Sequence, residues 1–474
     1  MLDKTKFYIN GEWVNPVKPK TLDVIDPSTE EACAVISMGG EADVNKAVAS
    51  AREAFETYSQ TSKEERLQLL KNLMDIMNKN NADMGEAVRL EMGAPKTLAD
   101  NSQAGSGPWH LGGFIEALEE FEDESKYRDT EKVIRHEPIG VCGLITPWNW
   151  PVNQIALKVI PAVAVGCTVV LKPSEIAPLS AMVFAEWMEE AGFPKGVFNL
   201  VNGDGPSVGS VMSKHPDIDM MSFTGSTRAG VMVTKDAADT VKRVSLELGG
   251  KSPNIIFADA DLQKAVKTGV LTCMNNTGQS CNAPTRMLVE KSVYDEAVKI
   301  AEETVQKVQV GPTTEEGRHI GPVVSELQFN KIQGLIQAGI DEGARLVAGG
   351  VGRPDGFEKG YYIKPTIFAD VNNEMTVAAE EIFGPVLAII PFETEEEAIK
   401  IGNDTPYGLA AYVQTQDLDK ANRVARKLRA GMVHMNGGGL SQGMPFGGYK
   451  QSGIGREGGK WGLEDFLETK AITC

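Results

Sequence analysis

The sequence predicts an α/β protein in which helices cover parallel β-sheets. Between about residues 140 and 260, short apolar runs of strand length alternate with segments of helical periodicity. A second stretch of the same kind extends from about 260 to 435. Strands that alternate with helices favour parallel sheets with helices on both faces, and 474 residues suffice for two or three domains with a large buried core.

The first stretch contains predicted buried strands and one clearly bounded helix. Pro178 is expected to begin this helix and Gly192 to end it. Its apolar side chains follow the i, i+3, i+4, i+7 spacing of one helix face, namely Phe184, Trp187, Met188 and Ala191. The strands are expected at Val141–Ile145, Thr168–Leu171, Val197–Val201, Met220–Phe223, Val244–Leu248 and Asn254–Phe257.

The second stretch contains predicted amphipathic helices. Residues 291–308 and 325–343 have the periodicity of two of them. Thr394 and Glu397 have the spacing of a capping box, which predicts a further helix over 395–402.

Three segments interrupt the regular pattern. Gly437–Gly439 and Gly447–Gly448 mark loops near the end of the chain. The charged segment 119–136 interrupts the first stretch. It is either a solvated loop or helix end, or an extended arm that leaves the body to meet a partner subunit.

The composition is that of a soluble acidic protein, with 42% hydrophobic and 24% charged residues. A formal net charge of −18 disfavours a nucleic-acid partner or an anionic membrane, because both require clustered Lys and Arg. The N-terminal residues lack the apolar core of a secretory signal. No stretch approaches the roughly 18–20 apolar residues of a membrane span.

The cysteines and histidines are isolated in the sequence. The six cysteines, at 33, 142, 167, 273, 281 and 474, have no paired spacing, which predicts reduced thiols in a cytoplasmic protein. The five histidines have no partner at metal-binding spacing, so we expect no metal site.

Two segments hold the residues with the clearest catalytic chemistry. Cys281 lies in a turn that contains glycine and asparagine, and a thiol in such a turn is a candidate nucleophile. Glu247 ends an apolar run and is a candidate general base. Alone, Cys281 could be a small buried residue and Glu247 a solvated strand end. Together they indicate an enzyme that forms a covalent thio-intermediate and then hydrolyses it.

Two other segments have features of nucleotide sites. In Phe223–Gly230 a strand runs into a Gly/Ser turn that begins a helix, and backbone N–H groups there favour phosphate. A plain strand-to-helix connection is the alternative. Lys172 and Glu175 follow another strand and could hold an adenosine ribose by its hydroxyls.

Two glycine motifs fail on context. The G-x-G-x-x-G match at Gly453–Gly458 has no strand before it and no βαβ unit after it. Gly250-Lys251-Ser252 resembles the end of a P-loop, but Ser245 stands where the first glycine is required. Neither is expected to bind a nucleotide.

The pentapeptide Pro147–Pro151 places Asn149 between two tryptophans after a predicted strand. A side-chain amide fixed at such a turn could donate a hydrogen bond to a developing oxyanion. Aromatic packing around a turn asparagine is the alternative.

In this order, the segments PWNWP, KPSE, FTGS, ELGGKSP, GQSC and EEIFGPV closely resemble the aldehyde dehydrogenase superfamily over essentially the whole chain. The resemblance implies a Rossmann-like cofactor domain without G-x-G-x-x-G, an α/β catalytic domain and a small β oligomerisation arm. The corresponding ranges are 1–117 and 138–248 for the cofactor domain, 249–447 for the catalytic domain, and 118–137 and 460–474 for the arm. A homodimer or homotetramer is implied.

The resemblance also implies roles for individual residues. Cys281 matches the nucleophile, Glu247 the general base and Asn149 the oxyanion donor, with the backbone N–H of Cys281. Lys172 and Glu175 match ribose contacts. The remaining matches on the cofactor side are Ile145, Pro147, Trp148, Ser174, Gly205, Phe223, Gly225, Ser226, Leu248, Gly249, Glu381 and Phe383.

The substrate side departs from members that oxidise simple hydrophobic aldehydes. Gln154 and Leu157 stand where many of these carry Met and Trp, and polar Ser280 and Asn282 flank the cysteine. Trp150 and Phe446 are expected to complete the pocket. These residues predict a roomier, more polar tunnel for a hydroxy- or semialdehyde.

The coenzyme and the product have alternatives. Glu175 disfavours a 2′-phosphate by like-charge repulsion, so NAD is expected before NADP, although both remain open. A CoA-acylating dehydrogenase would pass the thioester to CoA, but that branch typically lacks the base that Glu247 supplies. A non-catalytic binding protein on the same fold is the alternative from another class, and the presence of Cys281, Glu247 and Asn149 opposes it.

Overall fold

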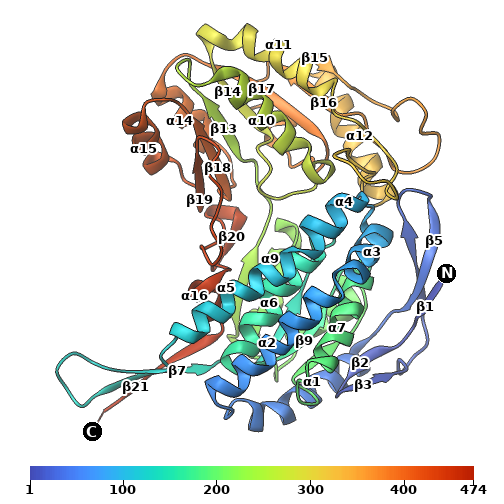
Figure 1. Ribbon diagram of the computed structural model, residues 1–474, viewed down its shortest axis with the longest axis vertical. Helices are drawn as coiled ribbons and strands as arrows, with labels where there is room; N and C mark the ends of the chain where they lie inside the picture. Colours follow the sequence, from blue (N-terminus) through green and yellow to red (C-terminus); the bar gives the residue numbers. More distant parts are fainter. Residues whose placement is uncertain (474) are drawn as a thin grey trace.

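The computed structural model describes residues 1–473 and divides into two lobes (Figure 1). One lobe contains an eight-stranded sheet, the other a seven-stranded sheet, and two three-stranded sheets lie at the periphery. Helices cover both large sheets, so the predicted α/β class is confirmed. Cys474, the last residue of the predicted arm, lies outside the described residues.

The eight-stranded sheet has a parallel centre with antiparallel edges. In spatial order its strands are β20 (Gly453–Ile454), β12 (Arg243–Glu247), β11 (Met220–Thr224), β8 (Val141–Ile145), β9 (Thr168–Lys172), β10 (Phe198–Leu200), β2 (Phe7–Ile9) and β3 (Glu12–Val14). From β12 to β10 all neighbours are parallel. The chain places β9 and β10 on one side of β8 but β11 and β12 on the other. The strand order therefore reverses between β8 and β11, and ligands bind outside the carboxyl ends of strands at such a point.

The main helices of this lobe pack into two hydrophobic clusters. They are α1 (Glu41–Tyr58), α2 (Lys63–Lys79), α3 (Asn81–Met92), α5 (Ser106–Glu120), α6 (Pro151–Val165), α7 (Leu179–Glu190), α8 (Ser210–Lys214), α9 (Thr227–Ala237) and α16 (Gly459–Asp465). Helix α6 is buried along almost its whole length, because it is apolar on nearly every side. Pro178 caps α7 as expected. All six predicted strands are confirmed to within one residue at each end.

The seven-stranded sheet is parallel except for one edge strand. In spatial order its strands are β15 (Arg345–Ala348), β16 (Thr366–Ala369), β17 (Val386–Phe392), β14 (Arg286–Glu290), β13 (Pro253–Ile256), β18 (Ala410–Gln414) and β19 (Met432–Met435). Only β15 is antiparallel to its neighbour. The main helices around it are α10 (Leu262–Met274), α11 (Tyr294–Val305), α12 (Glu326–Asp341), α14 (Glu395–Asn403) and α15 (Leu418–Lys427).

The predicted helices of this lobe are present with shorter ends. Residues 291–293 form a 3₁₀ turn before α11 rather than its first turn. Only half of the predicted capping box forms. Thr394 accepts a hydrogen bond from the Glu397 N–H at 3.1 Å, but the Glu397 carboxylate accepts from the N–H of Glu393 instead of that of Thr394.

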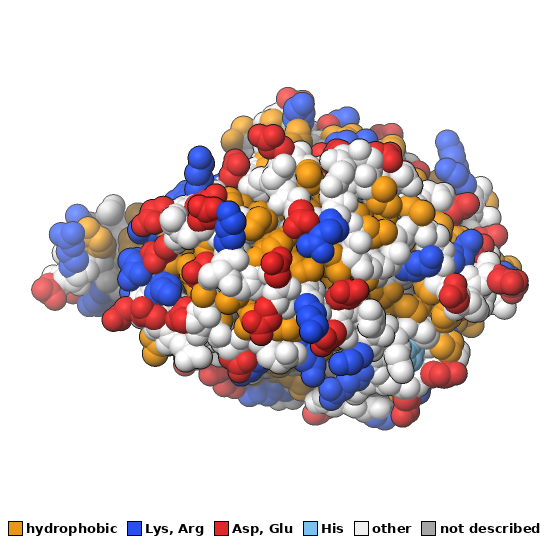
Figure 2. Space-filling model, turned by 90° about the horizontal axis from the view of Figure 1, so that it is seen from above, with side chains coloured by type: hydrophobic (Ala, Val, Ile, Leu, Met, Phe, Trp, Pro, Cys, Tyr) orange, Lys and Arg blue, Asp and Glu red, His pale blue; other side chains and the backbone are white. Residues whose placement is uncertain are grey.

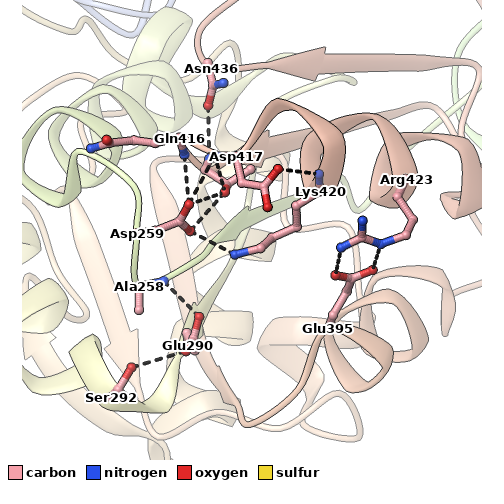
Figure 3. Close-up of polar contacts among 11 residues, drawn as sticks. Ala258, Asp259, Glu290, Ser292, Glu395, Gln416, Asp417, Lys420, Arg423 and Asn436 are labelled. Carbon is pink, nitrogen blue, oxygen red and sulfur yellow. Dashed lines mark hydrogen bonds and ion pairs between the residues drawn. The ribbon is translucent and has the colours of Figure 1, made fainter.

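An exposed carboxylate, that of Asp259, joins the end of β13 to the start of α15 (Figure 3). Asp259 follows β13 and accepts hydrogen bonds from Thr415 Oγ1 at 2.7 Å and Lys420 Nζ at 3.1 Å. The backbone N–H groups of Gln416 and Asp417 donate to the same carboxylate. In the same view Arg423 of α15 forms a bidentate pair with Glu395 of α14. These contacts fix the two outer helices of the lobe against its sheet.

The two small sheets have different positions. Strands β6 (Glu124–Lys126), β7 (Val133–Pro138) and β21 (Leu467–Ile472) form an antiparallel sheet that projects from the body beside the C-terminus (Figure 1). The charged segment is thus an extended hairpin after α5 and not a solvated loop. Strands β1 (Leu2–Lys4), β5 (Glu31–Ser37) and β4 (Thr21–Asp26) form the other sheet near the N-terminus.

The surface carries charges of both signs. Figure 2 shows basic and acidic side chains intermingled over the face that it views. Within residues 1–473, none of the helices has the length and apolar character needed to cross a membrane.

Candidate active site

A cavity of about 480 Å³ lies between the two lobes. On one side are segments at the carboxyl ends of β8, β11 and β12, which include the point where the strand order reverses. On the other side are the segments that precede β14 and β17. The predicted site residues that line this cavity are Pro147, Trp148, Asn149, Trp150, Gln154, Gly225, Ser226, Glu247, Leu248, Gly249, Ser280, Cys281, Asn282, Glu381, Phe383 and Phe446.

The other predicted residues lie outside this cavity's lining. They are Ile145, Leu157, Lys172, Ser174, Glu175, Gly205 and Phe223. Leu157 lines a neighbouring cavity. Ile145 and Lys172 lie side by side at the ends of β8 and β9, since a Cβ added at Gly209 would be 3.6 Å from one side chain and 3.8 Å from the other.

The loop that carries Cys281 has an unusual backbone. Asn276, Thr277 and Gly278 have φ angles of 52°, 56° and 73°, in the left-handed region that a β-branched residue such as Thr277 rarely adopts. A side chain at Gly278 would overlap the carbonyl oxygen of Gly384. Hydrogen bonds hold the conformation, including Thr277 Oγ1 to the Gly321 oxygen at 3.1 Å. Such strain is typical of functional sites, and here it fixes the position of the thiol.

Asn149 is 6% exposed, and its amide faces the same loop. Its Nδ2 donates to the backbone oxygen of Gln279 at 3.0 Å. The backbone oxygen of Asn149 accepts hydrogen bonds from Gln103 Nε2 at 3.0 Å and from Asn276 Nδ2 at 2.9 Å. An amide nitrogen carries two hydrogens, so one of them is left to point into the cavity beside Cys281.

Glu247 is 3% exposed, and neither of its carboxylate oxygens has a hydrogen-bond partner among the described residues. Nearby, Lys158 Nζ forms a buried ion pair with Glu457 Oε1 at 2.7 Å and donates to Ser222 Oγ at 3.1 Å. Burial raises the pKa of Glu247 well above its ordinary value, the Glu457 carboxylate raises it further, and Lys158 opposes both effects. A carboxyl group in a cavity with free oxygens and a raised pKa is a candidate general base.

The thiol of Cys281 is also shifted towards its protonated form. Burial raises its pKa most, and the carboxylates of Glu247 and Glu381 add to the effect, while the backbone N–H of Asn282 opposes it. These effects favour the protonated thiol over the thiolate, which is the reactive form of a cysteine.

One end of the cavity has the features of a pyrophosphate site. Ser226 is the N-cap of α9, and its Oγ accepts from the Ala229 N–H at 3.3 Å. A Cβ at Gly225 would lie 2.6 Å from the Phe223 ring, so a larger residue in this turn would have to displace that ring. Open N–H groups at the start of an eleven-residue helix attract phosphate.

Glu381 and Phe383 face this end from the other lobe. Glu381 Oε1 accepts from the Gly250 N–H at 2.9 Å, and burial raises the pKa of this carboxyl. Phe383 packs edge-to-face on Trp148 with ring centroids 5.4 Å apart. The two aromatic rings form a wall of the cavity between the phosphate end and Cys281.

Lys172 and Glu175 lie beyond the phosphate end. Lys172 is buried, which lowers the pKa of its ammonium group, and its Nζ donates to Gly203 O at 2.6 Å, Pro173 O at 2.9 Å and Glu175 Oε2 at 3.4 Å. Glu175 keeps a side-chain exposure of 32% and is the more accessible of the two. Gly205 begins a short π-helical turn, with open space where a Cβ would be.

Polar side chains also line the cavity near Cys281. Trp150 Nε1 donates to Ser280 Oγ at 2.8 Å, and Thr224 Oγ1 donates to Gln154 Oε1 at 2.8 Å. These two hydrogen bonds hold the side chains of Ser280 and Gln154 in fixed positions. The predicted polarity around Cys281 is therefore present, although part of it is used within the protein.

The sequence prediction missed several residues at this site. Lys158 and Glu457 were not identified, because one lies in an apolar helix and the other lies inside the rejected glycine motif. The further cavity residues that were missed are Asn153, Thr224, Thr272, Asn275, Ala283, Gln328, Lys331 and Tyr412. Among them, Asn153, Thr224 and Ala283 lie directly beside predicted site residues, so their neighbours in the sequence gave a signal.

Comparison with known proteins places this fold and cavity in one class. The model of the aldehyde dehydrogenase family matches residues 13–472, and the chain belongs to this family. It is 53% identical over its full length to 3-succinoylsemialdehyde-pyridine dehydrogenase of a Pseudomonas species, covering 99% of that protein.

Solved structures agree closely. An aldehyde dehydrogenase from Bartonella henselae superposes with a TM-score of 0.99 at 56% identity, over 100% of this chain and 99% of that one. A cysteine-to-alanine mutant of aldehyde dehydrogenase C from Pseudomonas syringae, in complex with NAD+ and octanal, gives 0.97 at 49% identity, over 99% and 96% of the two chains.

Proposed function

We propose that this protein oxidises an aldehyde to a carboxylic acid, with NAD as the electron acceptor, through a thioester on Cys281. The observation that carries the proposal is the shared cavity. It brings a cysteine, an amide donor and a buried carboxyl together with a glycine–serine helix start that suits a pyrophosphate.

The cavity's residues fit a dinucleotide. Gly225 and Ser226 would hold the pyrophosphate at the start of α9, and Glu175 would accept hydrogen bonds from the adenosine ribose. Glu381 and Phe383 would hold the nicotinamide end. The related enzyme from Pseudomonas syringae binds NAD+ together with octanal, which supports this assignment. When bound, NAD supplies the acceptor for the hydride that leaves the substrate carbon.

In the first step, the Cys281 thiolate attacks the aldehyde carbon. The proton of the thiol passes to Glu247, directly or through a water molecule, because this carboxyl has the raised pKa and the free oxygens that the transfer needs. The negative charge that develops on the aldehyde oxygen accepts hydrogen bonds from Asn149 Nδ2 and from the Cys281 backbone N–H. A donor of this kind lowers the activation free energy by about 3 kcal/mol.

In the second step, loss of hydride from the former aldehyde carbon leaves a thioester on Cys281. Glu247 gives up the proton it took from the thiol to solvent, and its carboxylate then accepts a proton from a water molecule whose oxygen attacks the thioester carbon. The C–S bond breaks, the acid is released, and the Cys281 sulfur takes up a proton again. The Lys158–Glu457 pair adjusts the proton affinity of Glu247 through its charges. Because the chain has this base, hydrolysis is favoured over transfer to CoA.

We also propose a division of labour between the predicted domain ranges. Residues 1–117 and 138–248 would bind NAD, and residues 249–447 would carry the nucleophile. The oligomerisation arm was predicted at 118–137 and 460–474; α16 packs in the core of the first lobe instead, so the second segment of the arm would be β21. The projecting sheet of β6, β7 and β21 offers exposed polar strands to a second subunit. We propose a homodimer or homotetramer in the cytoplasm, acting on a small-molecule aldehyde.

The test is NADH formation, measured at 340 nm, with a panel of aldehydes. The protein should turn over with NAD in the absence of CoA and release the free acid, and Cys281→Ala should abolish turnover. Near-normal activity of that variant would refute the nucleophile. A product that forms only with CoA would refute the hydrolytic step.

A further inference from the structure

A second cavity of about 380 Å³ adjoins the first. Asn153 and Phe446 line both cavities, so the two spaces meet at these side chains. Trp109 and Met444 line the second cavity and are 42% and 46% exposed, so it reaches the molecular surface. It therefore lies on a path from solvent to the part of the first cavity that Asn153 and Phe446 line.

The second cavity has no charged wall. Its lining among the described residues includes Asn101, Ser102, Ser106 and His110 but no Lys, Arg, Asp or Glu. Burial lowers the pKa of His110 to about 4, so this ring is neutral at physiological pH. A carboxylate or other charged group would lose its hydration here without gaining an ionic partner, which is costly.

A hydrogen bond between two helices orients one polar donor at the junction. His110 of α5 lies with its Nε2 2.6 Å from Oδ1 of Asn153 on α6. An amide oxygen only accepts, so Nε2 carries the hydrogen. The Trp109 ring packs edge-on against His110 at 4.7 Å and restricts the imidazole. Within residues 1–473, Asn153 Nδ2 donates to no protein acceptor, and both of its hydrogens remain available at the junction of the cavities.

We propose that the second cavity binds the tail of the aldehyde substrate, and that Asn153, positioned by His110, donates a hydrogen bond to an uncharged acceptor oxygen on that tail. The inference rests on the proposed function. It defines the substrate class as aldehydes with a keto or hydroxyl oxygen several bonds from the aldehyde carbon and an uncharged, largely apolar end. Trp109 and Leu157 supply the apolar surface for that end.

The test compares two aldehydes that differ only in the acceptor oxygen. We expect the unmodified enzyme to have a higher kcat/KM for 4-oxo-4-phenylbutanal than for 4-phenylbutanal, and succinic semialdehyde, with its carboxylate, to be the poorest of the three. Asn153→Leu should lower kcat/KM for the keto aldehyde about tenfold, since a buried acceptor loses its donor, and change that for 4-phenylbutanal less than about threefold. Asn153→Asp can still accept from His110 but cannot donate when ionised, and it should lose the same preference.

Variants of His110 separate positioning from folding. His110→Phe should reduce the keto preference, whereas His110→Gln, whose amide can still donate to Asn153 Oδ1, should keep more of it. Equal losses for both aldehydes in Asn153→Leu, or a preference of the unmodified enzyme for succinic semialdehyde, would overturn the inference and leave the proposed function standing. Failure to oxidise these aldehydes and octanal with NAD would overturn both.

Discussion

Replacement of Asn149 by alanine isolates the contribution of a single side-chain amide to the chemistry. In the structure Asn149 Nδ2 donates one hydrogen to Gln279 O at 3.0 Å, which leaves the other for the oxyanion. Loss of such a donor costs about 3 kcal/mol in the transition state, or roughly a 100-fold slower first turnover. The free energy of unfolding should fall by only about 1 kcal/mol, because one buried neutral hydrogen bond is lost.

The assay is a stopped-flow measurement of the first NADH turnover at saturating NAD, with urea unfolding as the control. The backbone oxygen of Asn149 keeps its bonds to Gln103 and Asn276 in the variant, so the loop should hold its place. Asn149→Asp matches the shape but can place a negative charge beside the oxyanion, and it should be slower than the alanine variant. A first-turnover rate within about threefold of the unmodified enzyme would refute the assigned role.

Three further outcomes are expected. Glu457→Gln removes a carboxylate that raises the pKa of Glu247, so the acid limb of the kcat–pH profile should move to lower pH by about one unit. An acid limb that stays in place or moves to higher pH would contradict this coupling. Glu175→Gln removes the charge that repels a 2′-phosphate, so kcat/KM should rise for NADP and fall for NAD by about tenfold each; an NADP preference in the unmodified enzyme would overturn the choice of coenzyme. Gly278→Ala forces a Cβ onto Gly384 in a left-handed backbone and should lower the free energy of unfolding by about 2 kcal/mol or more in urea; full stability would show that the loop can relax.

The elements that the sequence predicted well are those that local patterns determine. The buried strands and the helix after Pro178 follow from apolar periodicity and from breaker residues, and the structure places them within one or two residues. The sequence context also argued against the glycine motif at Gly453–Gly458, because no predicted strand precedes it and no βαβ unit follows it. In the structure its first two residues form β20, which pairs antiparallel with β12. The charged segment 119–136 left two readings open, since charge alone does not distinguish an edge strand from a loop.

Residues that depend on long-range packing were not predictable. Lys158 and Glu457 are separated by 299 positions and meet only because α6 and the segment before α16 pack together. Lys158 lies in the mainly apolar helix α6, and the periodicity of that helix contains no information about a charged partner. The pairing of His110 with Asn153 likewise depends on the packing of α5 against α6. Each residue alone has the appearance of an ordinary helix position.

The central claim is that Cys281 carries the acyl group and that Glu247 releases it. The most direct measurement is the intact mass of Glu247→Gln after mixing with octanal and NAD, followed by peptide mapping. The account predicts one equivalent of NADH, a mass increase equal to the octanoyl group on the peptide that contains Cys281, and slow loss of that mass. The account would be contradicted if the Glu247→Gln variant carried no acyl group and still turned over at the full rate. Acylation of another cysteine, such as Cys33, would also contradict it.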